Sequence, residues 1–424
     1  MTAASIGVPA SSQSKRAVTA AVIGNVLEWY DFAVYGYVAA IIGKNFFPGT
    51  DDTTELLKAF LTFGLGFVAR PIGGIVIGRM GDTHGRKAAL MLTIFLMAAG
   101  TVLIGILPTY ASIGFAAPAL LLLARLMQGF SAGGEWGGST AFIVEWAPAD
   151  RRGLFGSFQQ MSVVAGLLLG SAFAALLNTL LTPAEMADWG WRIPFLVGGI
   201  LGPIGLYMRR TIEETPHYAR VKDAAPAGGS SGFALAARAF GFTIVWTVCF
   251  YVLLTYMPSW TAKYMNLSPA AALWSNSIGL VALIIGIPIM GHLSDRYGRR
   301  PLLLICCIAF IIVPWPLFTY LASGNVPYVV LVLIQIGVAL LISLYSGAGP
   351  AAIAEIFPTR SRSTWMTTGY ALAVAVFGGS APYLSQWLVK TYSPTAPLWY
   401  LIFAAVISTV VIWSLKETAH DELA

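Results

Sequence analysis

Apolar segments of about 20 residues recur from one end of the chain to the other, and they limit the possible folds more than any other feature. A helix of about this length crosses the ~30 Å hydrocarbon layer of a bilayer. The composition agrees, since 57% of the residues are hydrophobic and 10% are charged, against ~25% charged in soluble domains. The runs do not alternate with polar residues, which excludes a transmembrane β-barrel. The sequence predicts an all-α polytopic membrane protein.

Gly, Pro and charged residues divide the apolar sequence into twelve predicted membrane spans. These are 17–43, 56–80, 88–108, 115–140, 154–181, 192–209, 239–262, 270–293, 301–322, 327–348, 365–390 and 396–415. The longest polar break, 209–238, follows the sixth span. We therefore expect an N-terminal six-helix bundle (1–208), a cytoplasmic linker (209–238) and a C-terminal six-helix bundle (239–424).

Two loop motifs occur once in each half of the chain. The first, G-x-x-x-D-x-x-G-[RK]-[RK], is GRMGDTHGRK at 78–87 and GHLSDRYGRR at 291–300. The second has Pro three and Arg seven residues after a Glu, and it is EWAPADRRG at 145–153 and EIFPTRSRS at 355–363. Both pairs keep the same order and nearly the same separation. This pattern indicates an internal duplication with pseudo-symmetric halves, which is typical of alternating-access carriers.

The repeated loops resemble the signature loops of the major facilitator superfamily. Further stretches resemble its metabolite:proton symporter family, which carries 2-oxoglutarate, citrate, shikimate and proline or betaine: GNVLEWYDFAVYG, FVARPIGG, RLMQGFSAGGEWGG, DWGWRIPF and FGGSAPYLSQWL. The resemblance covers essentially the whole chain. It implies the major facilitator fold, secondary active transport by alternating access, and a functional monomer in the bacterial cytoplasmic (inner) membrane.

The distribution of lysine and arginine predicts the topology. With both termini in the cytoplasm, 18 of the 25 Lys and Arg residues lie on the cytoplasmic side and 5 on the outer side. Cytoplasmic loops of membrane proteins carry such an excess. The net charge of +6 therefore reflects topology, and we expect lipid and a small molecule as partners, with no nucleic acid.

Other function classes have little support in the sequence. An ATP-driven pump needs a G-x-x-x-x-G-K-[ST] loop, and a membrane enzyme needs a motif such as H-E-x-x-H or G-x-S-x-G. The chain contains neither the G-x-x-x-x-G-K-[ST] loop nor H-E-x-x-H. The string G-x-S-x-G occurs at 129–133, inside a predicted span, and at 228–232, in the polar break, but no histidine lies at membrane depth to act as the base of such a serine. We expect neither enzyme activity nor a cofactor or metal, and a channel or a receptor remains the alternative to a carrier.

Charged residues lie deep inside the predicted spans of the first half. At 1.5 Å per residue, Glu28 is ~16 Å into the first span, and Arg70 and Arg125 are about 15 Å deep in the second and fourth. An isolated charge near the bilayer centre costs roughly 2.5–3.5 kcal/mol, and opposite charges at one depth offset this cost. Asp31 and Glu28 share one helix face, because they are three residues apart. These groups predict a functional site.

A small organic anion accounts best for two arginines at this depth. The planar guanidinium group binds a carboxylate through two parallel hydrogen bonds. The residues expected to contact substrate are Arg125, Asn25, Gln128, Tyr30, Arg70, Tyr251, Tyr256 and Tyr345. A di- or tricarboxylate such as 2-oxoglutarate or citrate is the favoured substrate, and a zwitterion such as proline or betaine is the alternative. Both arginines could instead be permanent partners of acidic residues.

A carboxylate is the expected carrier of the coupling ion. The four histidines lie in predicted loops, at a span end or in the tail, so none is placed at mid-membrane depth. The candidates for proton coupling are Asp31 first, then Glu28, and Glu135 nearer the inner surface. Transport is expected to be driven by the proton gradient, and sodium coupling remains open.

The repeated cytoplasmic loops are expected to act as a latch between the halves. Carboxylates such as Asp82 and Asp295 can meet the positive end of a neighbouring helix and nearby arginines. The gating candidates are Asp82, Arg86, Lys87, Asp295, Arg299, Arg300, Glu145, Arg151, Glu355 and Arg360. The alternative is that these charges only set the topology.

Overall fold

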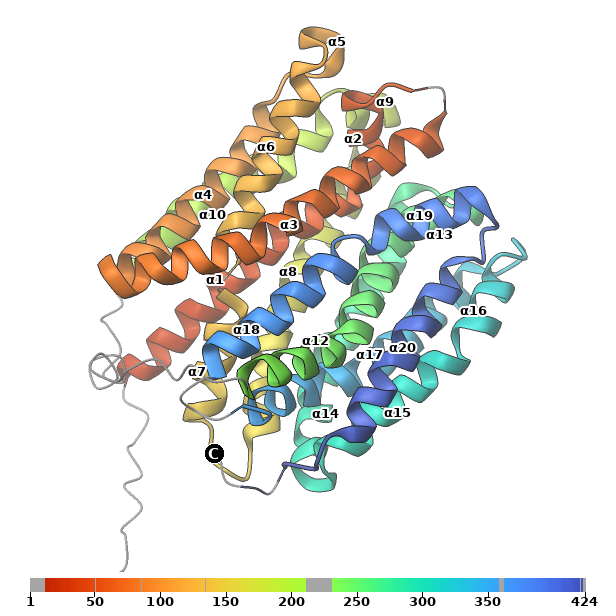
Figure 1. Cartoon of the computed structure of the whole chain (residues 1–424). Helices are drawn as coiled ribbons and strands as arrows, with labels where there is room; N and C mark the ends of the chain where they lie inside the picture. Colours follow the sequence, from red (N-terminus) through yellow and green to blue (C-terminus); the bar gives the residue numbers. More distant parts are fainter. Residues whose placement is uncertain are drawn as a thin grey trace, which may run out of the picture.

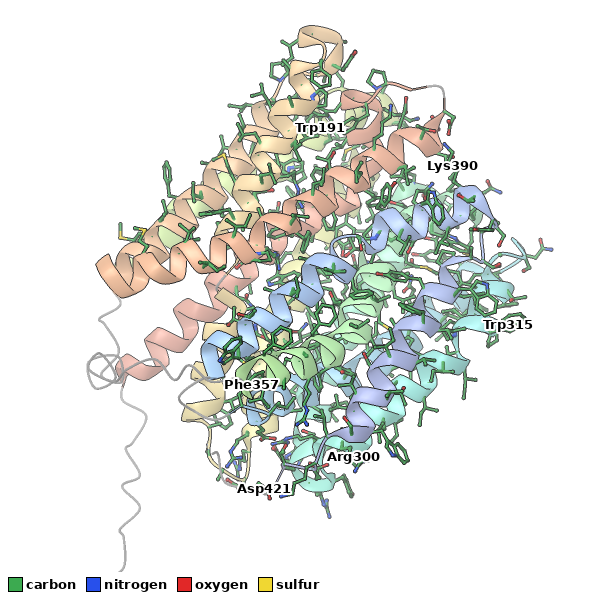
Figure 2. The ribbon with its side chains drawn as sticks, in the orientation of Figure 1. Trp191, Arg300, Trp315, Phe357, Lys390 and Asp421 are labelled. Atoms are coloured by element: carbon green, nitrogen blue, oxygen red, sulfur yellow. The ribbon has the colours of Figure 1, made fainter. Side chains whose placement is uncertain are left out.

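The computed structural model describes residues 12–49, 51–84, 86–133, 135–210, 231–357, 362–419 and 421, and these residues form helices and connecting loops without any strand. The helices run between two faces of the molecule (Figure 1). Figure 2 shows Asp421 and Arg300 at one face, which we call the C-terminal face. Trp191 and Lys390 mark the opposite face (Figure 2).

The first half of the chain forms one group of helices. They are α1 (Ser12–Tyr37), α2 (Ala39–Phe46), α3 (Asp52–His84), α4 (Arg86–Ile106), α5 (Tyr110–Ile113), α6 (Ala116–Ser131), α7 (Glu135–Trp146), α8 (Arg152–Leu180), α9 (Pro183–Asp188), η1 (Gly190–Arg192) and α10 (Ile193–Arg210). Within it α1 packs against α8 and α10, and α6 packs against α3 and α4.

The second half forms the other group (Figure 1). Its members are α12 (Ser231–Phe250), η2 (Tyr251–Tyr256), α13 (Met257–Tyr264), α14 (Pro269–Tyr297), α15 (Arg299–Ile312), α16 (Pro314–Leu321), α17 (Tyr328–Glu355), α18 (Arg362–Ala373), η3 (Val374–Gly378), α19 (Ala381–Thr391) and α20 (Pro397–Ser414). Helix α8 of the first half packs against α14 and α17 of the second, and α3 packs against α19. These contacts join the two groups.

Each of the twelve predicted spans coincides with one helix or with consecutive helices. Seven helices in the described part of the chain are long and apolar enough to cross a membrane, and the pair α15 and α16, bent by 43°, makes an eighth. Shorter apolar helices cover Met91–Ile106 and Ala116–Ser131. The predicted fold class, a polytopic all-α protein, is confirmed. The exact limits of the linker 209–238 remain a prediction, because 211–230 lies outside the described residues.

Breaks in the spans lie next to the centre of the molecule. The seventh and eleventh spans each contain a π-helical segment, η2 and η3, which widens the helix by one residue per turn. Such segments are frequent at functional sites. Segment η2 contacts α1, and η3 contacts α3, so both segments face the first half of the chain.

Glycines allow α3 and α6 to pack closely. A Cβ atom added to Gly129 would overlap the carbonyl oxygen of Gly66, and one added to Gly73 would overlap that of Phe130. In each case the obstacle is backbone, which cannot rotate away. Small residues at helix contacts let membrane helices approach in this way.

Replacing Gly129 by alanine is expected to destabilise the protein. Overpacking of this kind costs about 1–3 kcal/mol, because α3 and α6 must move apart. Thermal unfolding in detergent, followed by size-exclusion chromatography, measures the effect. Gly337→Ala on α17 is the matched control, since nothing lies within 4 Å of a Cβ there. Equal unfolding temperatures for the two variants would contradict the prediction.

Candidate functional site

The polar residues of α1 contact several different helices. The Asn25 side-chain amide donates to the Ser162 hydroxyl oxygen on α8 at 2.7 Å. Asp31 is buried and faces α4, where it accepts a hydrogen bond from the Thr101 hydroxyl at 2.7 Å. Glu28 is buried on the same helix. The carboxylates therefore lie within the helix packing of the first half.

Asp31 and Arg125 are connected by a chain of three hydrogen bonds. Thr101 donates to Asp31 Oδ2, and it accepts a hydrogen bond from Gln128 Nε2 at 2.8 Å. The Gln128 side-chain oxygen in turn accepts from Arg125 Nη1 at 2.8 Å. All four side chains are buried. A carboxylate and a guanidinium group are thus coupled through two neutral side chains.

Aromatic rings surround the guanidinium group of Arg125. Its central carbon lies 4.5 Å from the ring centre of Tyr35 and 5.0 Å from those of Phe32 and Phe63. Such contacts stabilise a desolvated cation. Nε and Nη2 of Arg125 are buried and have no hydrogen-bond partner among the described residues. These two atoms form the edge of the guanidinium group that binds a carboxylate side-on.

Arg70 has a similar environment on α3. Its guanidinium carbon lies 4.3 Å from the ring centre of Phe67, 4.6 Å from Phe32 and 5.5 Å from Trp29. Its Nε and Nη2 atoms also lack a partner in the part of the chain that is described. Because Phe32 contacts both arginines, the two guanidinium edges lie close to one aromatic ring.

A cavity lies between the two halves, next to the arginines. It is small, with room for about one water molecule. Its lining residues are Trp29, Gln160, Thr243, Trp246, Thr247, Phe250, Tyr251 and Tyr370. Neither arginine lines it directly: Trp29 lies against Arg70, and the Tyr251 ring packs on Phe67 with the centroids 5.3 Å apart. Arg70 is therefore one aromatic ring away from the cavity, whereas the rings against Arg125, those of Phe32, Tyr35 and Phe63, do not line the cavity themselves.

Further contacts join the two halves of the chain near the cavity. Toward the C-terminal face, Trp136 of α7 stacks on Tyr370 of α18 with ring centroids 3.6 Å apart. Toward the opposite face, the Tyr37 hydroxyl donates to the carbonyl oxygen of Leu254 at 3.1 Å and accepts from Asn276 at 3.2 Å.

Charged groups join the halves at the C-terminal face. Asp295 of α14 accepts hydrogen bonds from the backbone N–H groups of Gly153 (2.7 Å) and Leu154 (2.9 Å), at the start of α8. Arg299 donates to the same carboxylate at 2.7 Å. A carboxylate at a helix N-terminus is stabilised by the helix dipole. The second repeated loop therefore contacts the first half of the chain directly.

Glu355 and the C-terminal tail extend this cluster. Glu355 accepts from Arg299 at 3.3 Å and pairs with Arg152 at 3.5 Å. Arg152 also donates to the carbonyl oxygen of Asp421 at 2.9 Å. Burial acts to raise the pKa of Glu417, but hydrogen bonds from four backbone N–H groups more than offset it, so the pKa lies below its usual value. The tail therefore carries an ionised carboxylate at neutral pH.

Replacing Asp295 by asparagine is expected to loosen the C-terminal face. The contact with α8 loses its charge, and charge-assisted hydrogen bonds contribute roughly 1.5–3 kcal/mol each. Pulsed EPR between spin labels at exposed Ala149 and Tyr297 measures the separation, because the three native cysteines are buried. We expect a new, longer distance population. An unchanged distribution would contradict a latch role, and Asp52→Asn on the opposite face is the control.

Several residues predicted to bind substrate lie elsewhere. The Tyr30 hydroxyl donates to the carbonyl oxygen of Pro194 on α10 at 2.9 Å, and the Tyr256 hydroxyl donates to the Gln386 side-chain oxygen at 2.8 Å. The Tyr345 hydroxyl donates to the backbone of α12. The structure instead brings Arg125, Gln128, Arg70 and Tyr251 together around shared aromatic rings.

The gating candidates also separate into groups. Arg152, not the predicted Arg151, belongs to the buried cluster, since Arg151 is exposed and pairs with Asp150. Arg300 donates to the carbonyl oxygen of Trp413, away from Asp295. The remaining gating candidates have side chains outside the described residues: Asp82, Arg86, Lys87, Glu145 and Arg360. The same holds for Glu135, the third candidate for proton coupling.

Sequence reasoning missed Thr101, Gln160, Trp246 and Tyr370. Thr101 and Gln160 are polar residues inside apolar spans, which is a weak signal, because such residues more often bond their own helix. Trp246 and Tyr370 look like ordinary core residues. Among the described residues, no three His, Cys, Asp or Glu side chains are placed to hold a metal ion.

Comparisons with known proteins agree with this architecture. Residues 17–228 match the family model "Sugar (and other) transporter", and residues 243–423 match "Major Facilitator Superfamily". The xylose transporter XylE from Escherichia coli, in a partially occluded inward-open conformation, superimposes with a TM-score of 0.80 at 20% identity, over 97% of this chain and 100% of that one. This similarity shows the fold.

Curated relatives are similar over nearly the whole length. A proline/betaine transporter of Escherichia coli K12 is 35% identical over 96% of this chain and 85% of its own. An alpha-ketoglutarate permease of the same organism is 36% identical over 95% and 94%. A citrate-proton symporter of Klebsiella pneumoniae is 35% identical over 90% and 87%. The predicted resemblance and the expectation of a transporter instead of an enzyme are confirmed, and the chain belongs to the major facilitator superfamily.

Proposed function

We propose that the protein is a proton-coupled symporter of small organic anions with two or three carboxylates, such as 2-oxoglutarate or citrate. The observation that carries this proposal is a pair of buried guanidinium edges, one on Arg70 and one on Arg125, that have no hydrogen-bond partner among the described residues. Each edge offers two parallel N–H donors to a carboxylate. Two edges close to one ring, that of Phe32, suit a molecule with two carboxylates. Similarity to the alpha-ketoglutarate permease and the citrate-proton symporter supports the same class.

Transport would proceed by alternating access. The contacts between the halves at the two faces open in turn, so that the central cavity meets one side of the membrane and then the other. Substrate reaches the arginines when Trp29 and Tyr251 move aside. The protein would act as a monomer in the bacterial cytoplasmic membrane, with both termini in the cytoplasm.

Asp31 is the proposed proton carrier. It is buried, and it is linked to Arg125 by the hydrogen-bond chain through Thr101 and Gln128. Protonation removes the negative charge that holds Arg125 in this chain. Glu28 is the alternative carrier, and sodium is the alternative ion.

A zwitterion such as proline or betaine is the second candidate substrate. The cavity is lined by five aromatic side chains, Trp29, Trp246, Phe250, Tyr251 and Tyr370, and aromatic faces attract a quaternary ammonium group. The proline/betaine transporter is also as similar as the permease of organic anions. In this case one arginine would bind the single carboxylate.

Proton movement in proteoliposomes tests both candidates. Pulses of 2-oxoglutarate, citrate, betaine and proline are added to purified protein in weakly buffered liposomes, and the external pH is recorded. A rise in external pH after addition of a di- or tricarboxylate, but not of betaine or proline, supports the first proposal. Alkalinisation on betaine or proline alone supports the second. Labelled uptake without any pH change, but dependent on sodium, contradicts proton coupling. Liposomes without protein are the control.

A further inference from the structure

We propose that Thr101 is a positioning residue that transmits the protonation state of Asp31 to Arg125. This inference rests on the proposed function, because it assumes that Asp31 carries the proton and that Arg125 binds the substrate. Thr101 lies on α4, is fully buried and does not line the cavity. It bonds the carboxylate of Asp31 directly, and it is linked to Arg125 through the side chain of Gln128.

The Thr101 hydroxyl has two alternative acceptors. Its oxygen lies 2.7 Å from Asp31 Oδ2 and 3.0 Å from the carbonyl oxygen of Met97, one turn earlier on the same helix. A hydroxyl group has one proton to donate and two lone pairs that accept. Thr101 can therefore donate to only one of these acceptors at a time, while Gln128 continues to donate to its oxygen.

The protonation state of Asp31 decides between the two acceptors. An ionised Asp31 can only accept, so the Thr101 proton points to Asp31. When Asp31 takes up a proton on Oδ2, its own O–H donates to the Thr101 oxygen. The Thr101 proton then turns to Met97, and the second lone pair still accepts from Gln128. One proton is gained by Asp31, and no bond to carbon or nitrogen changes.

This exchange changes the electrostatic environment of Arg125. In the ionised state the hydrogen-bond chain runs from a cation to an anion, and each bond polarises the next in a buried environment. Protonation removes the anion, so the chain holds Arg125 less strongly. The guanidinium group is then free to bind a substrate carboxylate. Proton binding and anion binding therefore favour each other, as reciprocal coupling between two sites requires.

Thr101 is the hydrogen-bonded link between Asp31 and α6, and Arg125 of α6 also acts on Asp31 electrostatically through space. On α1, the nearest titratable neighbours are Tyr30, whose hydroxyl donates to Pro194, and Glu28. On α10, Gly198 packs against Asp31 Oδ1, where a Cβ atom would overlap it. Among the described residues, Oδ1 has no hydrogen-bond partner. Within the described part of the chain, the Thr101 hydroxyl is thus the group that donates a hydrogen bond to this carboxylate.

Variants at position 101 test the proposal. Thr101→Val and Thr101→Ala remove the hydroxyl, and Thr101→Ser retains it. Thr261→Val is the matched control, because Thr261 is also fully buried and also donates to the carbonyl oxygen four residues earlier, at 3.0 Å. Each variant is reconstituted in liposomes, and size-exclusion chromatography establishes that it is folded. Labelled citrate or 2-oxoglutarate is the probe, whichever the wild type accumulates.

Two measurements separate coupling from binding. Accumulation driven by a pH gradient depends on the link between proton and anion. Counterflow, measured with the same pH on both sides of the membrane, depends on anion binding and movement alone. For Thr101→Val and Thr101→Ala we expect accumulation to fall by about tenfold, within the usual range of coupling between sites, and counterflow to persist. Accumulation should also lose its dependence on external pH. Thr101→Ser and Thr261→Val should behave as the wild type.

Three results would contradict this inference, and they can be told apart. Wild-type accumulation in Thr101→Val and Thr101→Ala shows that the hydroxyl does not transmit the proton signal. Loss of both accumulation and counterflow in folded variants shows that Thr101 supports binding itself, which also contradicts the proposal. A wild type that moves neither anion contradicts the proposed function, before any variant is compared.

Discussion

Replacing Arg125 by glutamine is expected to abolish organic-anion uptake while the protein stays folded. Arg125 offers Nε and Nη2 to a substrate carboxylate, and charge-assisted hydrogen bonds contribute roughly 1.5–3 kcal/mol each. Losing two such bonds lowers the affinity by about 100-fold or more, at tenfold per 1.4 kcal/mol. Glutamine is long enough to keep some contact with Gln128, so the packing of α6 is disturbed little.

Initial uptake rates over a range of substrate concentrations measure this effect. Arg125→Lys is the matched variant, since it keeps the positive charge but loses the planar edge. We expect it to transport with a strongly raised KM, between the wild type and Arg125→Gln. Arg70→Gln removes the second guanidinium edge, so we expect it to weaken the uptake of dicarboxylates more than that of monocarboxylates. Uptake by Arg125→Gln with an unchanged KM would remove Arg125 from the substrate site.

Asp31→Asn is the second change with a large expected effect. Asparagine has nearly the same shape as aspartate, and with its NH2 group toward Thr101 it donates to the hydroxyl oxygen as a protonated Asp31 would, but it cannot gain or lose a proton. Accumulation against a gradient should be lost, because no proton movement drives it. Counterflow should remain, because a neutral side chain resembles the protonated state that binds the anion. Alkalinisation of the medium on substrate addition should disappear.

Glu28→Gln distinguishes the two carboxylates of α1. If Asp31 carries the proton, Glu28→Gln retains accumulation that depends on the pH gradient. The opposite result, in which Glu28→Gln loses accumulation and Asp31→Asn retains it, assigns the proton to Glu28. A pair of variants that both accumulate as the wild type does would point to another ion, and sodium dependence should then be measured.

The polar residues of α1 illustrate how far a helical pattern predicts a site. The spacing of three and four residues places Asn25, Asp31 and Tyr35 on one face, and all three are buried. Their partners nevertheless lie on three helices: Ser162 on α8, Thr101 on α4, and the carbonyl oxygen of Ala59 on α3. Helical period predicts which residues share a face. It does not say how many neighbours that face meets.

Neighbouring residues with the same chemistry can also take different roles. The sequence predicts Arg151 for the charge cluster, yet only its neighbour Arg152 is buried beside Glu355. Arg152 is the first residue of α8, whereas Arg151 precedes the helix with a non-helical backbone, so the place where α8 begins decides which one points inward. Arg299 and Arg300 both belong to α15, where the direction differs by about 100° between successive residues, and of the two Arg299 reaches Asp295.

The sequence by itself determined the twelve apolar spans, the duplicated loops, the superfamily and the presence of buried arginines and carboxylates. These features are local, because each membrane helix satisfies its own backbone hydrogen bonds and must be apolar along its length. Only the tertiary structure decided that Arg125 reaches Asp31 through Gln128 and Thr101, that the tail meets Arg152, and that Tyr30 turns to α10. These contacts join residues that are distant in the chain, so they depend on how the helices pack, and no short stretch of sequence carries that information.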